Sequence, residues 1–282
     1  MELLSWFTEP FALGFQQRAL LGGVLAAVMS AVVGTWLVLR GMAFFGDAFV
    51  HGIVPGIAAA VVLSINPLLG AAFAALVMIV AIELVRRNTS LSVDTSIGLL
   101  FVGMLALGVV IISRMDSYAG SLTTILFGDA LGVTVDSLIT QGVLLVIVVT
   151  VALFLYRPLI ALSFSEDKAQ LLGLKPKRAH AALLVLIAAA VIGSYQAVGT
   201  LLVFGLLVGP PAAAALITRT VPAMMGVAVI IGVLSVWVGL LLSFHWNTAG
   251  SATMALVPIV VFFIILLITR VATKLRPAVN HV

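Results

Sequence analysis

Runs of about twenty apolar residues, separated by short polar breaks, recur along almost the whole of this 282-residue chain. A helix of that length crosses the hydrocarbon core of a bilayer and satisfies its own backbone hydrogen bonds there. We therefore predict an all-α integral membrane protein, a polytopic bundle of about nine (8–10) transmembrane helices. The predicted spans are 18–39, 43–64, 67–85, 96–113, 137–156, 180–197, 199–218, 221–242 and 252–271.

The composition agrees with a membrane protein and excludes several other classes. Hydrophobic residues make up 63% of the chain and charged residues 9%, whereas soluble domains average about 25% charged residues. The basic residues are scattered among short loops, so the net charge of +4 does not indicate a nucleic-acid partner. The absence of cysteine removes disulfides and thiolate metal sites. We expect one transmembrane domain over residues 1–282, surrounded by membrane lipids.

The positive charges fix the expected orientation, because cytoplasmic loops carry an excess of Lys and Arg. With the N-terminus outside, twelve of the 14 basic residues fall on the cytoplasmic side. The two that fall outside are Arg18 and Arg114. We therefore predict a multi-pass plasma (inner) membrane protein with its C-terminus in the cytoplasm.

Asp47 and His51 place a carboxylate and an imidazole four residues apart inside the second predicted span. Residues at this spacing share a helix face, and an ionisable pair at this depth is costly unless it faces a bundle interior or a water-filled path. Asp and His also suit a divalent transition metal. The following Pro55 leaves the carbonyl of His51 without its helical donor. The pair is interpreted as part of a cation pathway; the alternative is a buried hydrogen bond that ties helices together.

A stripe of small residues follows the same helix beside this pair. It consists of Ala48, Gly52, Gly56 and Ala60, each four positions from the next. Small residues at this spacing let another helix approach closely. We predict that Gly52 and Gly56 are helix-packing residues and that the second spans of two copies meet along this stripe.

Two further segments depart from the pattern of plain spans. Adjacent Pro210 and Pro211 remove two backbone donors, so the seventh span is expected to kink or break there. Residues 157–178 form the main soluble-looking segment, in which Ser163 and Glu166 fit a capping box. Gly173 then ends the short helix. This segment is either a docking element for a cytoplasmic partner or an ordinary connecting helix.

The remaining ionisable residues offer few competing sites. Glu83 lies near basic residues at the cytoplasmic end of its span, Asp129 lies near a loop, and His245 lies near an outer end where it is a minor candidate ligand. The sequence contains no glycine-rich phosphate loop ending in Gly-Lys-Ser or Gly-Lys-Thr. We therefore expect that the chain is not itself an enzyme and that any ATP is hydrolysed on a separate subunit.

Several separated stretches, in order, resemble the membrane subunits of ABC importers for zinc, manganese and iron, nearly from end to end. These stretches are Leu39-Arg40-Gly41, Gly46-Asp47, His51-x-x-x-Pro55-Gly56, Ala106-Leu107-Gly108, Leu126-Phe127-Gly128-Asp129, Ala169, Gly173-Leu174, Val198-Gly199-x-Leu201-Leu202-Val203, Leu206-Leu207-Val208 and Pro211. The resemblance rests on their order and coverage.

This resemblance implies a homodimeric permease with two cytoplasmic ATPase subunits and an extracytoplasmic metal-binding protein that delivers the ion. It implies that Asp47 and His51 bind the metal in transit, and that Glu166, Ala169 and Gly173 belong to the segment that couples to the ATPase. Two copies would supply four ligands at a shared site. No cofactor is expected to be bound permanently; the divalent metal is cargo, and ATP binds to the partner subunit.

Two alternative functions remain open from the sequence. A related ABC permease for a metal chelate, haem or a vitamin would need a wide apolar path, and the Asp47–His51 pair argues against it. A secondary transporter would use the same pair as a proton relay and would show an inverted repeat, for which the sequence gives no convincing evidence.

Overall fold

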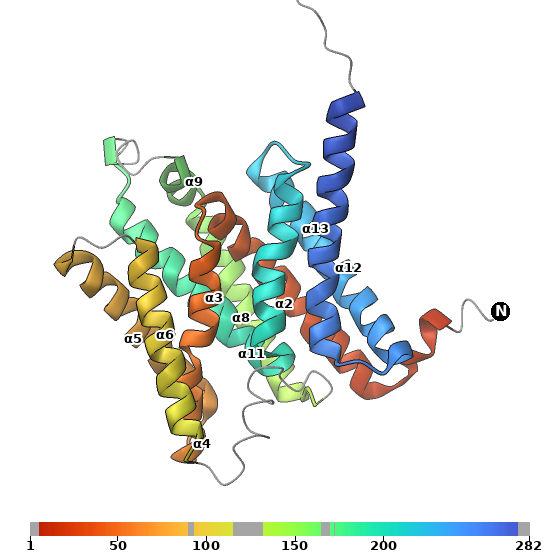
Figure 1. The fold of residues 1–282 in the computed structure, drawn as a ribbon, viewed down its shortest axis with the longest axis horizontal. Coiled ribbons are helices and arrows are strands. Elements are labelled where there is room, and N and C mark those ends of the chain that lie inside the picture. Colours follow the sequence, from red (N-terminus) through yellow and green to blue (C-terminus); the bar gives the residue numbers. More distant parts are fainter. Residues whose placement is uncertain (1–5, 90–92, 115–131, 165–169, 172, 276–282) are drawn as a thin grey trace, which may run out of the picture.

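The protein is described by a computed structural model covering residues 6–89, 93–114, 132–164, 170–171 and 173–275 (Figure 1). Over these residues the regular elements are all helices. In chain order they are η1 (Pro10–Ala12), α2 (Gly14–Leu39), α3 (Ala43–Gly52), α4 (Val54–Val62), α5 (Pro67–Asn88), α6 (Val93–Ile112), α8 (Val135–Phe154), α9 (Tyr156–Phe164), α11 (Pro176–Ala215), α12 (Val221–Trp246) and α13 (Gly250–Leu275).

The described part of the chain has eight helical segments that are long and apolar enough to cross a membrane. Helices α3 and α4 together form one of them, Ala43–Val62, and the first part of α11 forms another, Pro176–Tyr195. A shorter apolar helix, Leu202–Ala215, completes α11. The predicted all-α bundle of eight to ten spans is therefore confirmed.

The break in α11 lies at Gly199, and the prediction of a break at Pro210 and Pro211 is wrong. Gly199 has φ 76° and ψ 164°, whereas the helix continues through both prolines. Glycine adopts a positive φ without the steric cost that a side chain would impose. Pro211 cannot donate to the carbonyl of Leu207. That carbonyl instead faces Gly34 of α2, where an added Cβ would overlap it.

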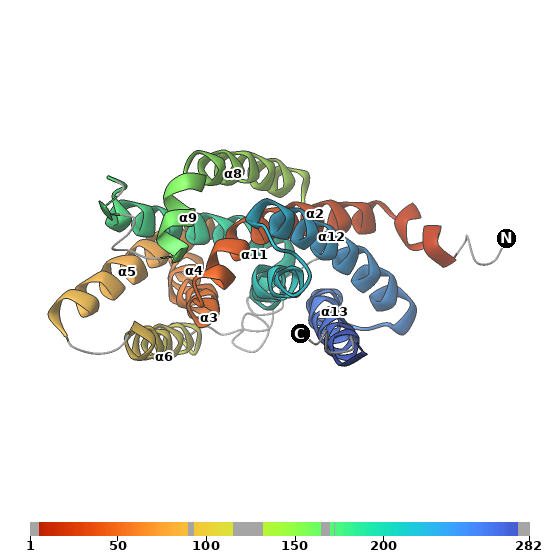
Figure 2. The ribbon, with the colours of Figure 1, turned by 90° about the horizontal axis from the view of Figure 1, so that it is seen from above.

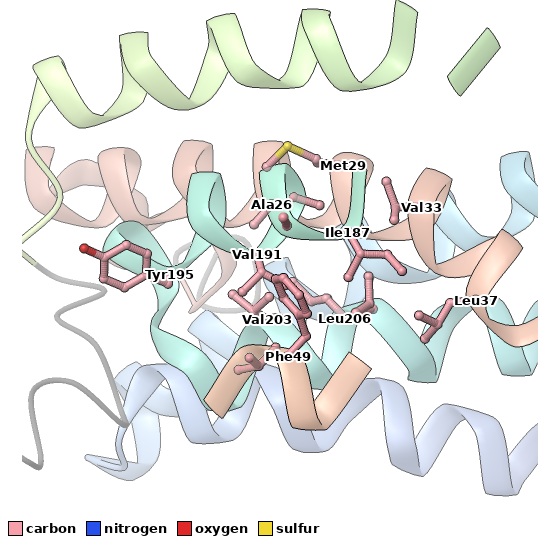
Figure 3. Close-up of a cluster of buried hydrophobic side chains, with 14 of the residues drawn as sticks. Ala26, Met29, Val33, Leu37, Phe49, Ile187, Val191, Tyr195, Val203 and Leu206 are labelled. Carbon is pink, nitrogen blue, oxygen red and sulfur yellow. The ribbon is translucent and has the colours of Figure 1, made fainter. Parts of the chain in front are cut away.

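Helix α2 runs through the middle of the bundle and packs most extensively on α11. Viewed from above, α8 lies on one face of the bundle, and α6 and α13 lie on the other (Figure 2). Buried side chains of α2 and α11 form the core between them, and Phe49 of α3 joins that core (Figure 3). Because Phe49 is fully buried, it fixes which face of α3 points away from the core.

Helices α4 and α5 meet through a reciprocal contact of two glycines. A Cβ added to Gly56 would overlap the carbonyl of Gly70, and a Cβ added to Gly70 would overlap the carbonyl of Gly56. Likewise, a Cβ on Gly52 would overlap the sulfur of Met78 in α5. Gly52 and Gly56 are thus helix-packing residues within one chain. The prediction that this stripe meets a second copy is wrong, because α5 of the same chain already covers it.

We expect Gly56→Ala to destabilise the protein by about 1–3 kcal/mol, because the added methyl group would force two backbones apart. The matched control is Gly142→Ala in α8, where an added Cβ meets nothing within 4 Å. The measurement is thermal unfolding of the purified protein in detergent. Equal melting temperatures for the two variants would contradict the proposed backbone contact.

Candidate functional site

Asp47 and His51 lie together on the partly open face of α3. The Nε2 atom of His51 lies 3.5 Å from Oδ1 of Asp47, and the two side chains are 22% and 27% exposed, respectively. Phe45, Phe49 and Val50 on the other sides of this short helix are buried. The sequence prediction that the two groups share one face is therefore confirmed. The arrangement offers a carboxylate and an imidazole nitrogen to the same small volume.

The helix that carries this pair ends directly after it. Ile53 separates α3 from α4, and Pro55 stands in the first turn of α4. The backbone N–H of Ile53 is directed at the carbonyl of His51, which lacks its helical donor because Pro55 has no N–H. Gly108 of α6 lets that helix approach the break, since a Cβ there would lie 3.0 Å from Val54 and 3.2 Å from the nitrogen of Pro55.

The aromatic ring of Phe101 in α6 packs beside the His51 ring. Its ring centre lies 5.9 Å from that of the imidazole at an interplanar angle of 61°, and 6.1 Å from the ring of Phe44. The Nδ1 atom of His51 is buried without a hydrogen-bond partner. The ring therefore presents one nitrogen, Nε2, toward Asp47. Sequence reasoning missed Phe101, because no local spacing links residues fifty positions apart.

The pair provides only part of a metal site in one chain. Within the residues the structure describes, no group of three or more His, Cys, Asp and Glu side chains is arranged to hold a metal. A protein site for zinc normally has four ligands, three of them from protein where the fourth stays open. Asp47 and His51 therefore need ligands from elsewhere to hold such an ion firmly.

The other candidate ligand, His245, has a structural partner at the end of α12. Its Nε2 atom donates to the backbone carbonyl of Trp6 at 3.0 Å, and its ring stacks on the Trp6 indole with centres 4.3 Å apart. This contact ties the N-terminal segment to α12. Asp129, the remaining candidate of the sequence, lies outside the described residues.

The predicted coupling segment is described only in part. Glu166 and Ala169 lie outside the described residues. Gly173 is exposed with φ +71°. Helix α11 begins at Pro176, four residues before the predicted span 180–197. A hollow of about 440 Å³ lies beside Gly173 at this end of α11, and its basic lining residues are Lys175, Lys177 and Arg178.

Comparisons with known proteins agree with this architecture. The sequence profile of the ABC 3 transport family matches residues 12–269. The chain is 30% identical over 272 residues to a "Probable iron transport system membrane protein" of Haemophilus influenzae, covering 96% of this chain and 100% of that one. It is 33% identical over 261 residues to the manganese transport system membrane protein MntC of Halalkalibacterium halodurans, covering 92% and 89%.

The fold is also similar to a solved structure, PsaBC from Streptococcus pneumoniae in complex with Fab. The TM-score is 0.84 at 26% sequence identity, with 93% of this chain and 95% of that chain covered. The spans, their order and these matches define a polytopic membrane permease. The chain belongs to the ABC 3 transport family.

We expect Phe101→Leu to weaken Zn²⁺ binding by about 2–10-fold, because an edge-to-face aromatic contact contributes about 0.5–1.5 kcal/mol. The affinity is measured by competition with a chelating dye on the purified protein. Leu99→Ala, at a position 65% exposed on the same helix, is the control. In a His51→Ala background the Phe101 change should have no further effect; an equal loss there would show that Phe101 does not act through His51.

Proposed function

We propose that this chain is the permease subunit of an ATP-binding cassette importer that moves a divalent zinc, manganese or iron ion across the plasma membrane. The observation that carries the proposal is the Asp47–His51 pair on the partly open face of a membrane-spanning helix. An ionisable pair at such a depth is costly and marks an ion path. The relatives, which are named as iron, manganese and zinc transport systems, support the same cargo.

We further propose that two copies of the chain complete the site. One chain supplies a carboxylate and one imidazole, and a second copy across a two-fold axis would double this to four ligands. Two Asp carboxylates would also balance the charge of a divalent ion in a low-dielectric setting. The contact would form at the exposed side of α3, where Phe44 is 46% exposed, and not along the glycine stripe that α5 covers.

The surroundings of His51 favour a passing ion over a resident one. A histidine that holds a metal tightly usually donates its second ring nitrogen to an acceptor, and loss of that acceptor costs about 10–100-fold in affinity. The buried Nδ1 of His51 has no such partner. A weak site lets the ion leave, which supports the metal as cargo and the absence of a permanent cofactor.

The proposed partners follow from the membership of the family and from the two ends of the bundle. A cytoplasmic ATPase would dock on the segment 157–178, with Glu166, Ala169 and Gly173 at the contact, and would hydrolyse the ATP. An extracytoplasmic metal-binding protein would deliver the ion to the opposite side. This arrangement places the N-terminus outside and the C-terminus in the cytoplasm, as the distribution of basic residues predicts.

We expect Asp47→Ala to lower metal uptake by at least about tenfold, since a direct ligand contributes no less than the outer partners of a ligand do. Uptake of radioactive ⁵⁴Mn²⁺ or ⁶⁵Zn²⁺ by proteoliposomes that contain the whole transporter measures this. Asp136→Ala, which removes a carboxylate from the first turn of α8, is the matched control. If the Asp47 variant assembles normally and its metal uptake is unchanged, Asp47 is not a metal ligand and the proposed metal site is contradicted.

The shared-site proposal predicts disulfide formation between two subunits through Phe44→Cys. The chain has no natural cysteine, so one introduced thiol can pair only with its copy. Val80→Cys, at an equally exposed position of α5, should remain monomeric under the same oxidation. The measurement is a non-reducing gel of active transporter. If Phe44→Cys and single cysteines on either side of it all fail to crosslink, each subunit binds the ion alone.

A further inference from the structure

A lateral groove of about 360 Å³ lies between α5, α8 and α11. Every side chain that lines it is apolar, and all three helices belong to membrane-spanning segments. Its lining includes Leu68, Ala72 and Ile79 of α5, Leu144 of α8, and Ala189 and Ile192 of α11.

Two structural features leave this space open. Helix α5 is held tightly against α4 by the Gly56–Gly70 contact but touches α11 only lightly. Where α5 and α11 face one another, several lining residues are alanines, including Ala72 and Ala189. Their side chains are too short to fill the distance that the α4 contact imposes. The groove is therefore a consequence of backbone geometry and short side chains.

The length of the groove matches one leaflet of a bilayer. Leu68 is the second residue of α5, and Ile79 lies eleven residues further on, which corresponds to about 16 Å of helix. The hydrocarbon core is about 30 Å thick, so one leaflet contributes about 15 Å. The groove thus extends from the end of the membrane where α5 begins to about its middle.

We propose that this groove binds one acyl chain of a phospholipid from the leaflet at the start of α5. Water has no polar partner in a cavity lined only by hydrocarbon, and such cavities stay dry. An unfilled groove would forfeit the dispersion contacts of all its lining atoms. A flexible hydrocarbon chain is the ligand that supplies those contacts without bringing a polar group into the membrane interior.

A second copy of the protein is not expected to fill the groove. This expectation rests on the proposed function, in which the second copy completes the Asp47–His51 site. The exposed side of α3 borders α6 through the Phe44–Phe101 contact, and α6 lies on the face of the bundle opposite α8 (Figure 2). A partner that completes the Asp47–His51 site would therefore contact the α6 face. The α8 side, where the groove lies, then remains open to lipid.

The bound chain would act as a packing element between α5 and the α8–α11 pair. Because α5 has few direct contacts with α11, the acyl chain would supply side support that protein atoms do not provide. The groove recognises the hydrocarbon of the lipid and not its headgroup, so phospholipids with different headgroups can fill it.

The test is photo-crosslinking of the complete transporter in nanodiscs that contain phosphatidylglycerol with a diazirine in its acyl chain. Labelled peptides are identified by mass spectrometry. We expect labelling of the groove residues to exceed, several-fold, labelling at Val146 and Ile147, which are exposed on α8 outside the groove. Ala189→Phe and Ala72→Phe, which fill the groove from its two sides, should each abolish that excess.

Ala223→Phe, an equal enlargement at an exposed position of α12 outside the groove, is the matched control and should keep the excess. Two results would overturn the proposal: groove labelling no stronger than at Val146 and Ile147 of α8, or a disulfide between two subunits through Ala189→Cys. If one filled variant fails to fold, the other decides the question. The experiment measures lipid attachment and not metal uptake. A negative result would therefore contradict lipid binding in the groove without contradicting the proposed transport function.

Discussion

The close approach of α2 and α11 at Gly34 and Leu207 is the contact on which the bundle depends. Only glycine at position 34 allows the backbone of α2 to lie against the Leu207 carbonyl. The Leu207 carbonyl has no helical hydrogen bond from position 211, because Pro211 has no N–H. The close approach of α2 covers this polar group, which would otherwise be exposed to hydrocarbon. The same packing creates the core that receives Phe49 of α3. Through Phe49, the position of α2 and α11 decides that Asp47 and His51 point outward.

The sequence predicts the local features of this protein well. Apolar length predicts the spans, and the i, i+4 spacing predicts that Asp47 and His51 meet. Each of these features depends only on the residues of one helix and on the lipid or water around it, so the sequence of that helix is enough to predict it. The Asp–His contact of 3.5 Å in the structure is a direct consequence of helix geometry.

The features that the sequence did not predict depend on contacts between distant segments. Proline chemistry correctly identifies a lost hydrogen bond at Pro211, but whether the helix breaks depends on the neighbour that Gly34 provides. The glycine stripe correctly indicates close packing, yet its partner is α5 of the same chain. Phe101 carries no local signal at all, because its role exists only once α6 lies against α3.

The reciprocal contact of Gly56 and Gly70 has a mechanical consequence. With each backbone seated against the other, neither α4 nor α5 can roll about its own axis without driving peptide groups together. The two helices must therefore move as one stiff part in any change of shape during transport. Helix α4 follows the helix that carries Asp47 and His51 after the single residue Ile53. A displacement at the Asp47–His51 pair therefore reaches α5 through its contact with α4, and the loosely packed side of α5 gives it room to move.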